Sequence, residues 1–122
     1  QKYSAVYLDL DDTLELGDRV NQWLMLYLYQ CVNNNIEIHL LTRHARDINE
    51  TLSKHKISPE LFCEIIHIKD GGDKSRYIKN KNAIFIDDSF RERLDVREKC
   101  GINVFDLDEV EALIDWTELR FN

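Results

Sequence analysis

The chain has 122 residues, of which 43% are hydrophobic and 32% charged, and its formal net charge at pH 7 is −7. This length and composition predict a single globular domain, residues 1–122, and they exclude a disordered or membrane-spanning chain. The negative charge argues against a nucleic-acid or anionic-membrane surface, because such surfaces need clustered Lys and Arg. The three widely spaced cysteines contain no C-x-x-C pair. They indicate reduced, mostly buried thiols in a cytoplasmic protein.

The first apolar run, A-V-Y-L at residues 5–8, predicts a buried strand that ends in a cluster of acids. Asp9, Asp11 and Asp12 follow it directly. Carboxylates this close together need a nearby cation or raised pKa values. Because the ligands are hard oxygens without a Cys or His partner, they favour Mg2+ over zinc. We therefore expect a magnesium site at the end of this strand.

A polar connection at residues 15–18 leads into the first helix. Apolar residues then recur at three and four spacing, which predicts a largely buried helix over residues 19–32. Asp18 is its expected N-cap. Three asparagines at residues 33–35 are expected to end the helix, because Asn tolerates the left-handed conformation.

A second β-branched run at residues 36–41 predicts a strand that ends in Thr42. The Thr42 hydroxyl has two interpretations: it caps the helix expected at residues 45–55, or it belongs to a site at the strand end. Its neighbours Arg43 and His44 either touch a substrate or form a solvated helix start.

Pro59 breaks that helix, and residues 62–68 predict a third strand. A turn-forming loop at residues 69–73 leads to Lys74, at the start of a short helix. An ammonium group among acids and phosphate oxygens would hold an anion and a nucleophile in register, so Lys74 is a candidate site residue. Its rivals are Lys69, Lys79 and Lys81.

A fourth strand at residues 83–86 ends in Asp87 and Asp88, a second acid pair at the tip of an apolar run. Capping of the helix expected at residues 90–99 would explain one of these carboxylates, but not two separate pairs. A metal shared with the first cluster would explain both pairs. This is the strongest indication of a site in the sequence.

A fifth strand at residues 102–105 and a final helix at residues 106–114 complete the pattern, and residues 116–122 either pack back on the core or lead to a neighbouring domain. Five strands alternating with helices predict an α/β fold, a three-layer sandwich with a five-stranded parallel sheet. Ligands bind such sheets at the carboxyl ends of the strands, where the proposed site residues lie.

These residues resemble the motifs of the haloacid dehalogenase (HAD) superfamily, in the same order along the chain. The matching positions are Asp9-x-Asp11-x-Thr13 after the first strand, Thr42, Lys74 and Asp87-Asp88. The resemblance covers essentially the whole chain. It implies the sheet order 5-4-1-2-3, no cap domain, and a Mg2+-dependent phosphohydrolase that works through an aspartyl-phosphate.

The resemblance also implies a role for each matching residue. Asp9 is the nucleophile and a Mg2+ ligand. Asp11 protonates the leaving oxygen and deprotonates the hydrolytic water, and its main-chain carbonyl is a further ligand. Thr42 donates a hydrogen bond to the transferring phosphoryl group, and Lys74 holds the anion.

The second acid pair has two roles to share between its members. Asp88 is expected to complete the metal ligands, while Asp87 orients a bound water or Lys74, and these roles are interchangeable. Asp12 occupies the variable position of the first motif and has no role. The expected metal site is Asp9, Asp11, Asp87 and Asp88.

Without a cap the site is open, so we expect a large phosphorylated substrate, or a lid from a fused domain or partner subunit. Residues 86–93, I-D-D-S-F-R-E-R, resemble the ending of small HAD domains that load acyl carriers or are fused to ATP-grasp ligases. The chain begins with Gln1 and not Met, which suggests excision from a longer protein. The alternative function is therefore a non-hydrolytic or carrier-loading accessory domain of a larger enzyme.

Overall fold

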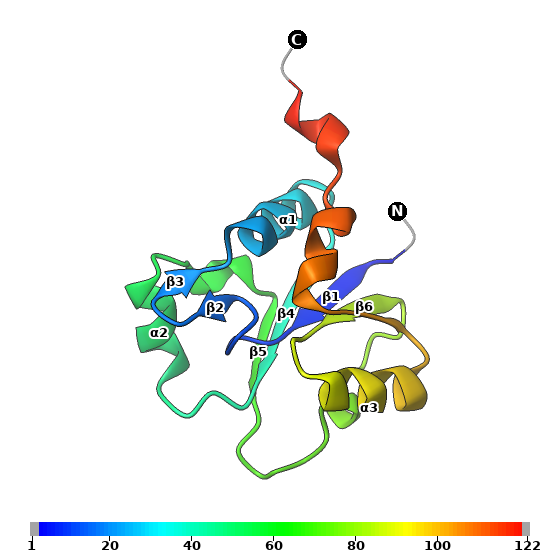
Figure 1. Ribbon diagram of the computed structural model, residues 1–122. Helices are drawn as coiled ribbons and strands as arrows, with labels where there is room; N and C mark the ends of the chain where they lie inside the picture. Colours follow the sequence, from blue (N-terminus) through cyan, green and yellow to red (C-terminus); the bar gives the residue numbers. More distant parts are fainter. Residues whose placement is uncertain (1–2, 121–122) are drawn as a thin grey trace.

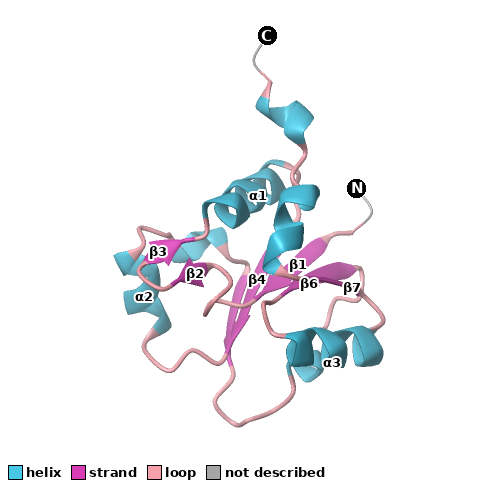
Figure 2. Cartoon of the chain, viewed as in Figure 1, coloured by secondary structure: helices cyan, strands magenta, loops and turns pink. Residues whose placement is uncertain are grey.

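The computed structural model describes residues 3–120 and contains a five-stranded parallel sheet with β1 at its centre (Figure 1, Figure 2). The strand order is β5-β4-β1-β6-β7, and every neighbouring pair is parallel. The strands are β1 (Ala5–Leu8), β4 (Glu37–Thr42), β5 (Glu64–His67), β6 (Ala83–Ile86) and β7 (Asn103–Phe105). The five predicted strands are thus confirmed, with small differences at their ends.

The expected order 5-4-1-2-3 numbers the strands of the large sheet alone. The labels used here also count the two strands of a separate hairpin, so the numbers differ. Its strands, β2 (Glu15–Leu16) and β3 (Arg19–Val20), pair with each other in antiparallel fashion. Counted without them in chain order, the large sheet reads 3-2-1-4-5 from β5 to β7. The strands that precede Asp9 and Asp87 are therefore neighbours.

Both faces of the sheet are apolar. Successive side chains of a strand point to opposite faces, and accordingly Leu8 and Tyr7 belong to two different apolar clusters. Helix α1 (Gln22–Asn33) packs in the cluster of Leu8, and helix α3 (Phe90–Cys100) packs in that of Tyr7. Figure 1 shows these helices on opposite sides of the sheet. Burial on both faces explains why the strands read as continuous apolar runs.

Helix α1 begins later than predicted, at Gln22, because the chain at Arg19 still belongs to β3. Its N-cap is Asn21, whose side-chain oxygen accepts a hydrogen bond from the backbone N–H of Leu24 at 3.2 Å. The prediction that Asp18 caps this helix is wrong, since the side chain of Asp18 is 99% exposed and lies on the hairpin turn.

The Asn21→Ala variant is expected to lose about 1 kcal/mol of unfolding free energy, the usual value of an N-cap. The amide of Asn21 also donates to the backbone carbonyl of Thr13 at 3.1 Å, so the loss extends to the hairpin connection. Urea denaturation would measure it. Asp18→Ala is the matched control and should change the free energy of unfolding little, because its ion pair with Lys54, at 3.7 Å, is exposed. Equal losses in the two variants would contradict the assignment.

The remaining helices are shorter than predicted or have 3-10 geometry. Helix α2 (Ile48–Lys54) begins after Asp47, whose side chain accepts from the N–H of Glu50 at 3.2 Å. The predicted final helix is a 3-10 helix, η3 (Leu107–Leu113). The other 3-10 helices are η1 (Pro59–Leu61), η2 (Lys74–Tyr77) and η4 (Trp116–Leu119).

The segment after η3 packs against α1. Gln30 and the backbone of Asp115 exchange two hydrogen bonds of 2.8 Å. The ring of Trp116 meets that of Trp23 edge-on, with centroids 5.5 Å apart. The described residues 116–120 contact α1 but are mostly exposed, so a connection to a neighbouring domain stays a prediction, and residues 121–122 lie outside the described range.

All three cysteines are free, and their burial differs. Cys31 is buried, Cys100 is partly exposed and Cys63 is exposed, so the expectation of mostly buried thiols is wrong. Cys63 precedes β5, which is an edge strand of the sheet and has a neighbouring strand, β4, on one side only. Among residues 3–120, no helix has the length and apolar character needed to cross a bilayer.

Candidate active site

The two acid clusters meet at the carboxyl edge of the sheet. Leu8 of β1 lies opposite Ile86 of β6, so the next residues along each strand, Asp9 and Asp87, emerge side by side. The backbone N–H of Asp9 continues the ladder by donating to the carbonyl of Ile86 at 3.1 Å. Carboxylate oxygens of Asp9, Asp87 and Asp88 all lie within 4.8 Å of one another. The convergence expected from the two acidic strand ends is therefore present.

A buried lysine lies among these acids. Lys74 is 1% exposed, and its Nζ lies 2.8 Å from Asp87 Oδ2 and 3.0 Å from Asp9 Oδ1. The 3-10 helix η2 that carries it is tied to α3, because Ser75 bonds the carboxylate of Asp95 through its backbone N–H and its hydroxyl, at 3.1 and 3.0 Å. The contact expected of Lys74 is confirmed, while its catalytic role stays a prediction. Two of its rivals bond backbone carbonyls instead, namely Lys79 and Lys81.

Burial and mutual repulsion change the acidity of the cluster. Burial raises the pKa of Asp9 to about 6, and the charge of Asp87 adds to the rise while Lys74 opposes it. Burial and Asp87 likewise raise the pKa of Asp88. Burial disfavours the ammonium of Lys74, but Asp9 and Asp87 outweigh it and raise the lysine pKa above its ordinary value. The site thus holds more negative charge than one lysine balances, which is the condition that favours a bound cation.

The two members of the second acid pair have different surroundings. Asp87 is buried, and its oxygens accept from Lys74 Nζ and from the N–H of Ser89 at 2.9 Å. Asp88 is exposed, and its carboxylate accepts a long bond, 3.4 Å, from the hydroxyl of Thr13. Neither acid caps α3, because its cap is Ser89, which accepts from the N–H of Glu92 at 3.3 Å. Asp88 therefore has the freer carboxylate.

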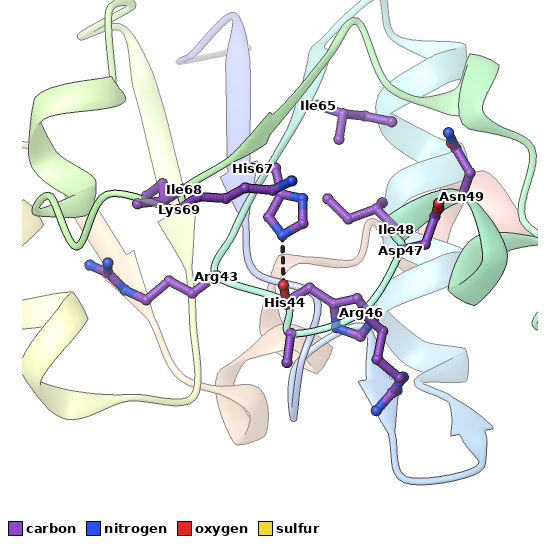
Figure 3. A pocket seen from close by; sticks show the side chains of 11 residues that line it. Arg43, His44, Arg46, Asp47, Ile48, Asn49, Ile65, His67, Ile68 and Lys69 are labelled. Atoms are coloured by element: carbon purple, nitrogen blue, oxygen red, sulfur yellow. Dashed lines mark hydrogen bonds between the residues drawn. The ribbon is translucent and has the colours of Figure 1, made fainter.

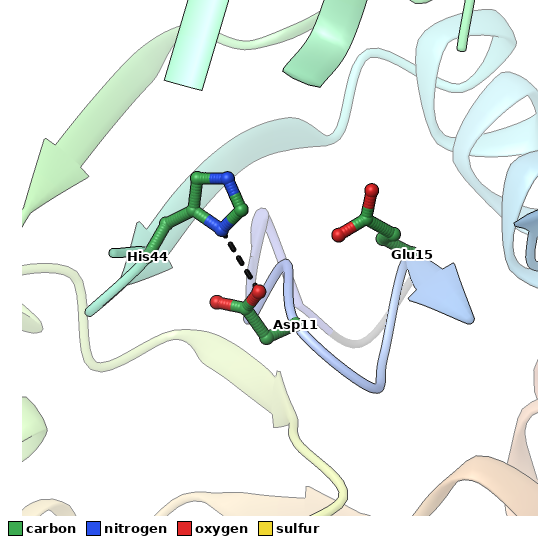
Figure 4. Close-up of side chains that lie close together, drawn as sticks. All are labelled: Asp11, Glu15 and His44. Atoms are coloured by element: carbon green, nitrogen blue, oxygen red, sulfur yellow. Dashed lines mark hydrogen bonds and ion pairs between the residues drawn. The ribbon is translucent and has the colours of Figure 1, made fainter. Parts of the chain in front are cut away.

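Asp11 faces a different partner from Asp9. Its Oδ1 lies 2.8 Å from His44 Nδ1, and His44 Nε2 lies 2.6 Å from the hydroxyl of Thr51 (Figure 4). On an extended backbone, residues two apart point the same way, so Asp9 and Asp11 would share one direction. The chain instead turns immediately after Asp9, where two backbone N–H groups donate to the carbonyl of Leu10. The carboxylate of Asp11 therefore lies beside His44 and outside the cluster of Asp9, Asp87 and Asp88. Only its main-chain carbonyl remains a predicted metal ligand.

Sequence reasoning missed a buried pair next to Asp11. Glu15 is 6% exposed and its Oε2 lies 2.7 Å from His55 Nε2, although the sequence assigned it to a polar connection. Asp11, Glu15 and His44 also offer ligand atoms within 4.8 Å of one another (Figure 4). Each of the three already has a short hydrogen-bond partner, which accounts for the group without an ion. No local pattern signals such a pair, because its members lie far apart along the chain.

Thr42 lies buried at the end of β4, as expected for a site hydroxyl. Its oxygen accepts from the N–H of His44 at 3.0 Å, which leaves its own hydrogen free to donate. It does not cap α2, because Asp47 does. His44 is 3% exposed, so the interpretation of a solvated helix start is wrong for it. Arg43 pairs with Glu92 at 2.9 Å.

The fold and the site define an α/β domain with three converging carboxylates and a buried lysine at the carboxyl edge of a parallel sheet. No protein-family model matches the sequence, and no curated protein matches it. Solved structures do resemble it. The N-terminal part of protein BF1531 from Bacteroides fragilis, which contains a phosphatase domain and was solved with Mg, has a TM-score of 0.67 and 18% identity over 85% of this chain and 36% of that one.

An uncharacterized protein from Corynebacterium glutamicum ATCC 13032 Kitasato has a TM-score of 0.64 and 12% identity, and the match covers 91% of this chain and 94% of that one. At these identities the likeness shows the fold alone. This chain spans about a third of the Bacteroides structure, 36% of its length.

Proposed function

We propose that this domain is a HAD-type, Mg2+-dependent phosphohydrolase that cleaves phosphate monoesters through an aspartyl-phosphate on Asp9. The observation that carries the proposal is the position of Lys74, buried between Asp9 and Asp87 with Asp88 alongside. A lone buried lysine among converging acids suits the binding of an anion beside a nucleophile. The phosphatase domain with Mg in the similar Bacteroides structure supports it.

The donor set fits Mg2+. Asp9, Asp88 and the main-chain carbonyl of Asp11 would hold it, since Mg2+ takes hard oxygen ligands and completes its shell with water and substrate phosphate. Asp87 is the orienting residue, because Lys74 and the N–H of Ser89 already occupy its oxygens. The bound cation would draw negative charge from the phosphoryl group, which makes phosphorus open to a carboxylate.

The chain's own residues would perform the transfer. A carboxylate oxygen of Asp9 attacks phosphorus, and the bond from phosphorus to the ester oxygen breaks. Asp11 gives that oxygen its proton, and the alcohol leaves. Asp11 then takes a proton from water, whose oxygen attacks the aspartyl-phosphate, and inorganic phosphate departs with Asp9 restored. Lys74 and the Thr42 hydroxyl hold the phosphoryl oxygens.

Within residues 3–120, the β2–β3 hairpin alone lies where a cap could stand, which leaves the proposed site open in this part of the chain. We propose that a phosphorylated substrate is covered by a fused domain or partner subunit, in a cytoplasmic protein. Arg93 ties the segment after Asp87 to the strand, donating to the carbonyl of Asp87 at 2.8 Å. This segment is the one that resembles carrier-loading HAD domains, so a non-hydrolytic accessory domain remains the alternative. A broad panel of phosphate esters without turnover would favour it.

The test uses an aryl phosphate with Mg2+ and the Asp11→Asn variant. A good leaving group needs little protonation, so the first step should survive, whereas hydrolysis of the aspartyl-phosphate lacks its base and slows by about a hundredfold or more. The expected result is a burst of one equivalent of phenol and a phosphorylated protein visible by mass spectrometry. Asp12→Asn, which removes the adjacent charge, should turn over steadily. Wild-type protein without turnover would contradict the proposal.

A further inference from the structure

A pocket of about 830 Å³ lies at the carboxyl ends of β4 and β5, and β4 is the neighbour of β1, the strand that Asp9 follows. We call it the basic pocket and define it by its charged lining: three cations and one carboxylate. These residues are Arg43, Arg46, Lys69 and Asp47. Figure 3 shows Lys69 extended across the pocket toward His67, with Arg43 and Arg46 on either side. The lining is positive, although the chain carries a net charge of −7.

One residue connects the basic pocket to the candidate active site. His44 lines the pocket, and its ring bonds Asp11 at 2.8 Å. Its backbone carbonyl accepts from His67 Nε2 at 2.6 Å, which fixes it to β5 (Figure 3). Asp11 is the residue proposed to protonate the leaving oxygen. The departing part of the substrate therefore lies on the side of the site where the basic pocket begins.

A second pocket also adjoins Asp11, and its charge is opposite. It has a volume of about 380 Å³ and four carboxylates against two cations, Lys54 and Arg46, the second of which lines both pockets. The carboxylates are those of Asp11, Asp12, Glu15 and Asp18. A negatively charged leaving group would be repelled there and attracted to the basic pocket.

The cations of the basic pocket differ in how free they are. Arg43 is held by Glu92 at 2.9 Å, with a second bond of 3.4 Å. Arg46 is 65% exposed, and its contact with Glu15 is 3.7 Å long. Within residues 3–120, Lys69 has no ion-pair partner. Lys69 and Arg46 are thus available to an incoming anion.

We propose that the basic pocket binds a second anionic group on the leaving-group side of the substrate, so that the preferred substrates are phosphate monoesters carrying a further phosphate or carboxylate. This inference rests on the proposed function and deepens it by naming the substrate class. Lys69 and Arg46 are its specificity residues, and His44 separates the bound anion from Asp11.

Binding of phosphonates tests the inference apart from turnover, because their C–P bond resists this chemistry. Wild-type protein in Mg2+ would be titrated with alkane bisphosphonates of increasing chain length, with phosphonocarboxylates, and with alkyl monophosphonates as the matched ligands. Amide shifts in nitrogen-labelled protein would locate them. We expect the best bisphosphonate to shift residues 43–49 and 65–69 and to bind at least about tenfold more tightly than its monophosphonate, the effect of one charge-assisted contact.

The double variant Arg46→Ala with Lys69→Ala should abolish that difference, and both side chains are exposed enough to leave the fold intact. Lys79→Ala with Arg97→Ala removes the same charge from exposed positions outside the pocket and should preserve it. Comparing the two second groups shows whether phosphate or carboxylate is preferred. Equal affinity for mono- and bisphosphonates, or an advantage that survives the double variant, would overturn the inference. Turnover of simple esters would still decide the proposed function separately.

Discussion

The Asp9→Asn variant is expected to lose at least about a thousandfold in turnover, and yet to be more stable than the wild type when metal is absent. The first effect follows from removal of the proposed nucleophile. The second follows from the site's electrostatics, since the pKa of Asp9 is raised to about 6 from 3.8, so its charged form is disfavoured in the fold. A shift of about two units sets an upper limit of about 3 kcal/mol on the gain.

The stability of the metal-free protein should also depend on pH, in a direction that follows from the raised pKa of Asp9. A carboxyl group whose folded pKa is raised binds more protons in the folded state, so the metal-free protein gains stability as the pH falls from above 6 toward 4. Urea denaturation with a chelator at about pH 8 and about pH 5 should show this gain in the wild type and a smaller one in the variant. Added Mg2+ should stabilise the wild type more than it stabilises the Asp9→Asn variant. A variant less stable than the wild type under chelation would contradict the account.

The Lys74→Met variant is expected to lose about 3–5 kcal/mol of unfolding free energy and all turnover, because it removes the buried partner of two acids. Asp9 and Asp87 would face each other and Asp88 without a cation. Mg2+ should restore part of the stability by supplying positive charge. Denaturation with and without Mg2+ measures both effects.

Two controls separate this charge effect from general damage. Lys79→Met, at an exposed position, should change stability by less than about 0.5 kcal/mol. The double variant Lys74→Met with Asp87→Asn should be more stable than Lys74→Met alone, because the second change removes one of the stranded charges. If the two changes were simply additive, the coupling between Lys74 and Asp87 would be absent.

Local pattern determined the elements and the strand ends. Apolar β-branched runs gave five strands, and the acids at two of their tips located the site, because a residue that directly follows a buried strand emerges at a known edge. Asn35, with φ of 60°, ends the first helix region in the left-handed conformation that its sequence predicted. Lys74 was identified by its order along the chain, and its contacts confirm the position.

Other features depended on contacts between distant segments. Helix α1 begins later than the apolar periodicity predicts, because the residues before it form β3, which pairs with β2. Periodicity within one segment contains no information about that pairing. The exposure of Cys63 reflects its place before an edge strand, which depends on strand order.

The sequence by itself determined the α/β pattern and the two acidic strand ends, because each follows from residue type and short-range spacing, whereas Lys74 was distinguished from its rivals only by the order of the motifs it resembles. Only the tertiary structure decided that Asp11 contacts His44 and that Glu15 pairs with His55. It also decided that a positively charged pocket lies next to the acidic site, although the chain as a whole is negative. Side-chain direction after a turn, and the meeting of residues from separate strands and loops, depend on the packing of the whole domain. No window of sequence contains that information.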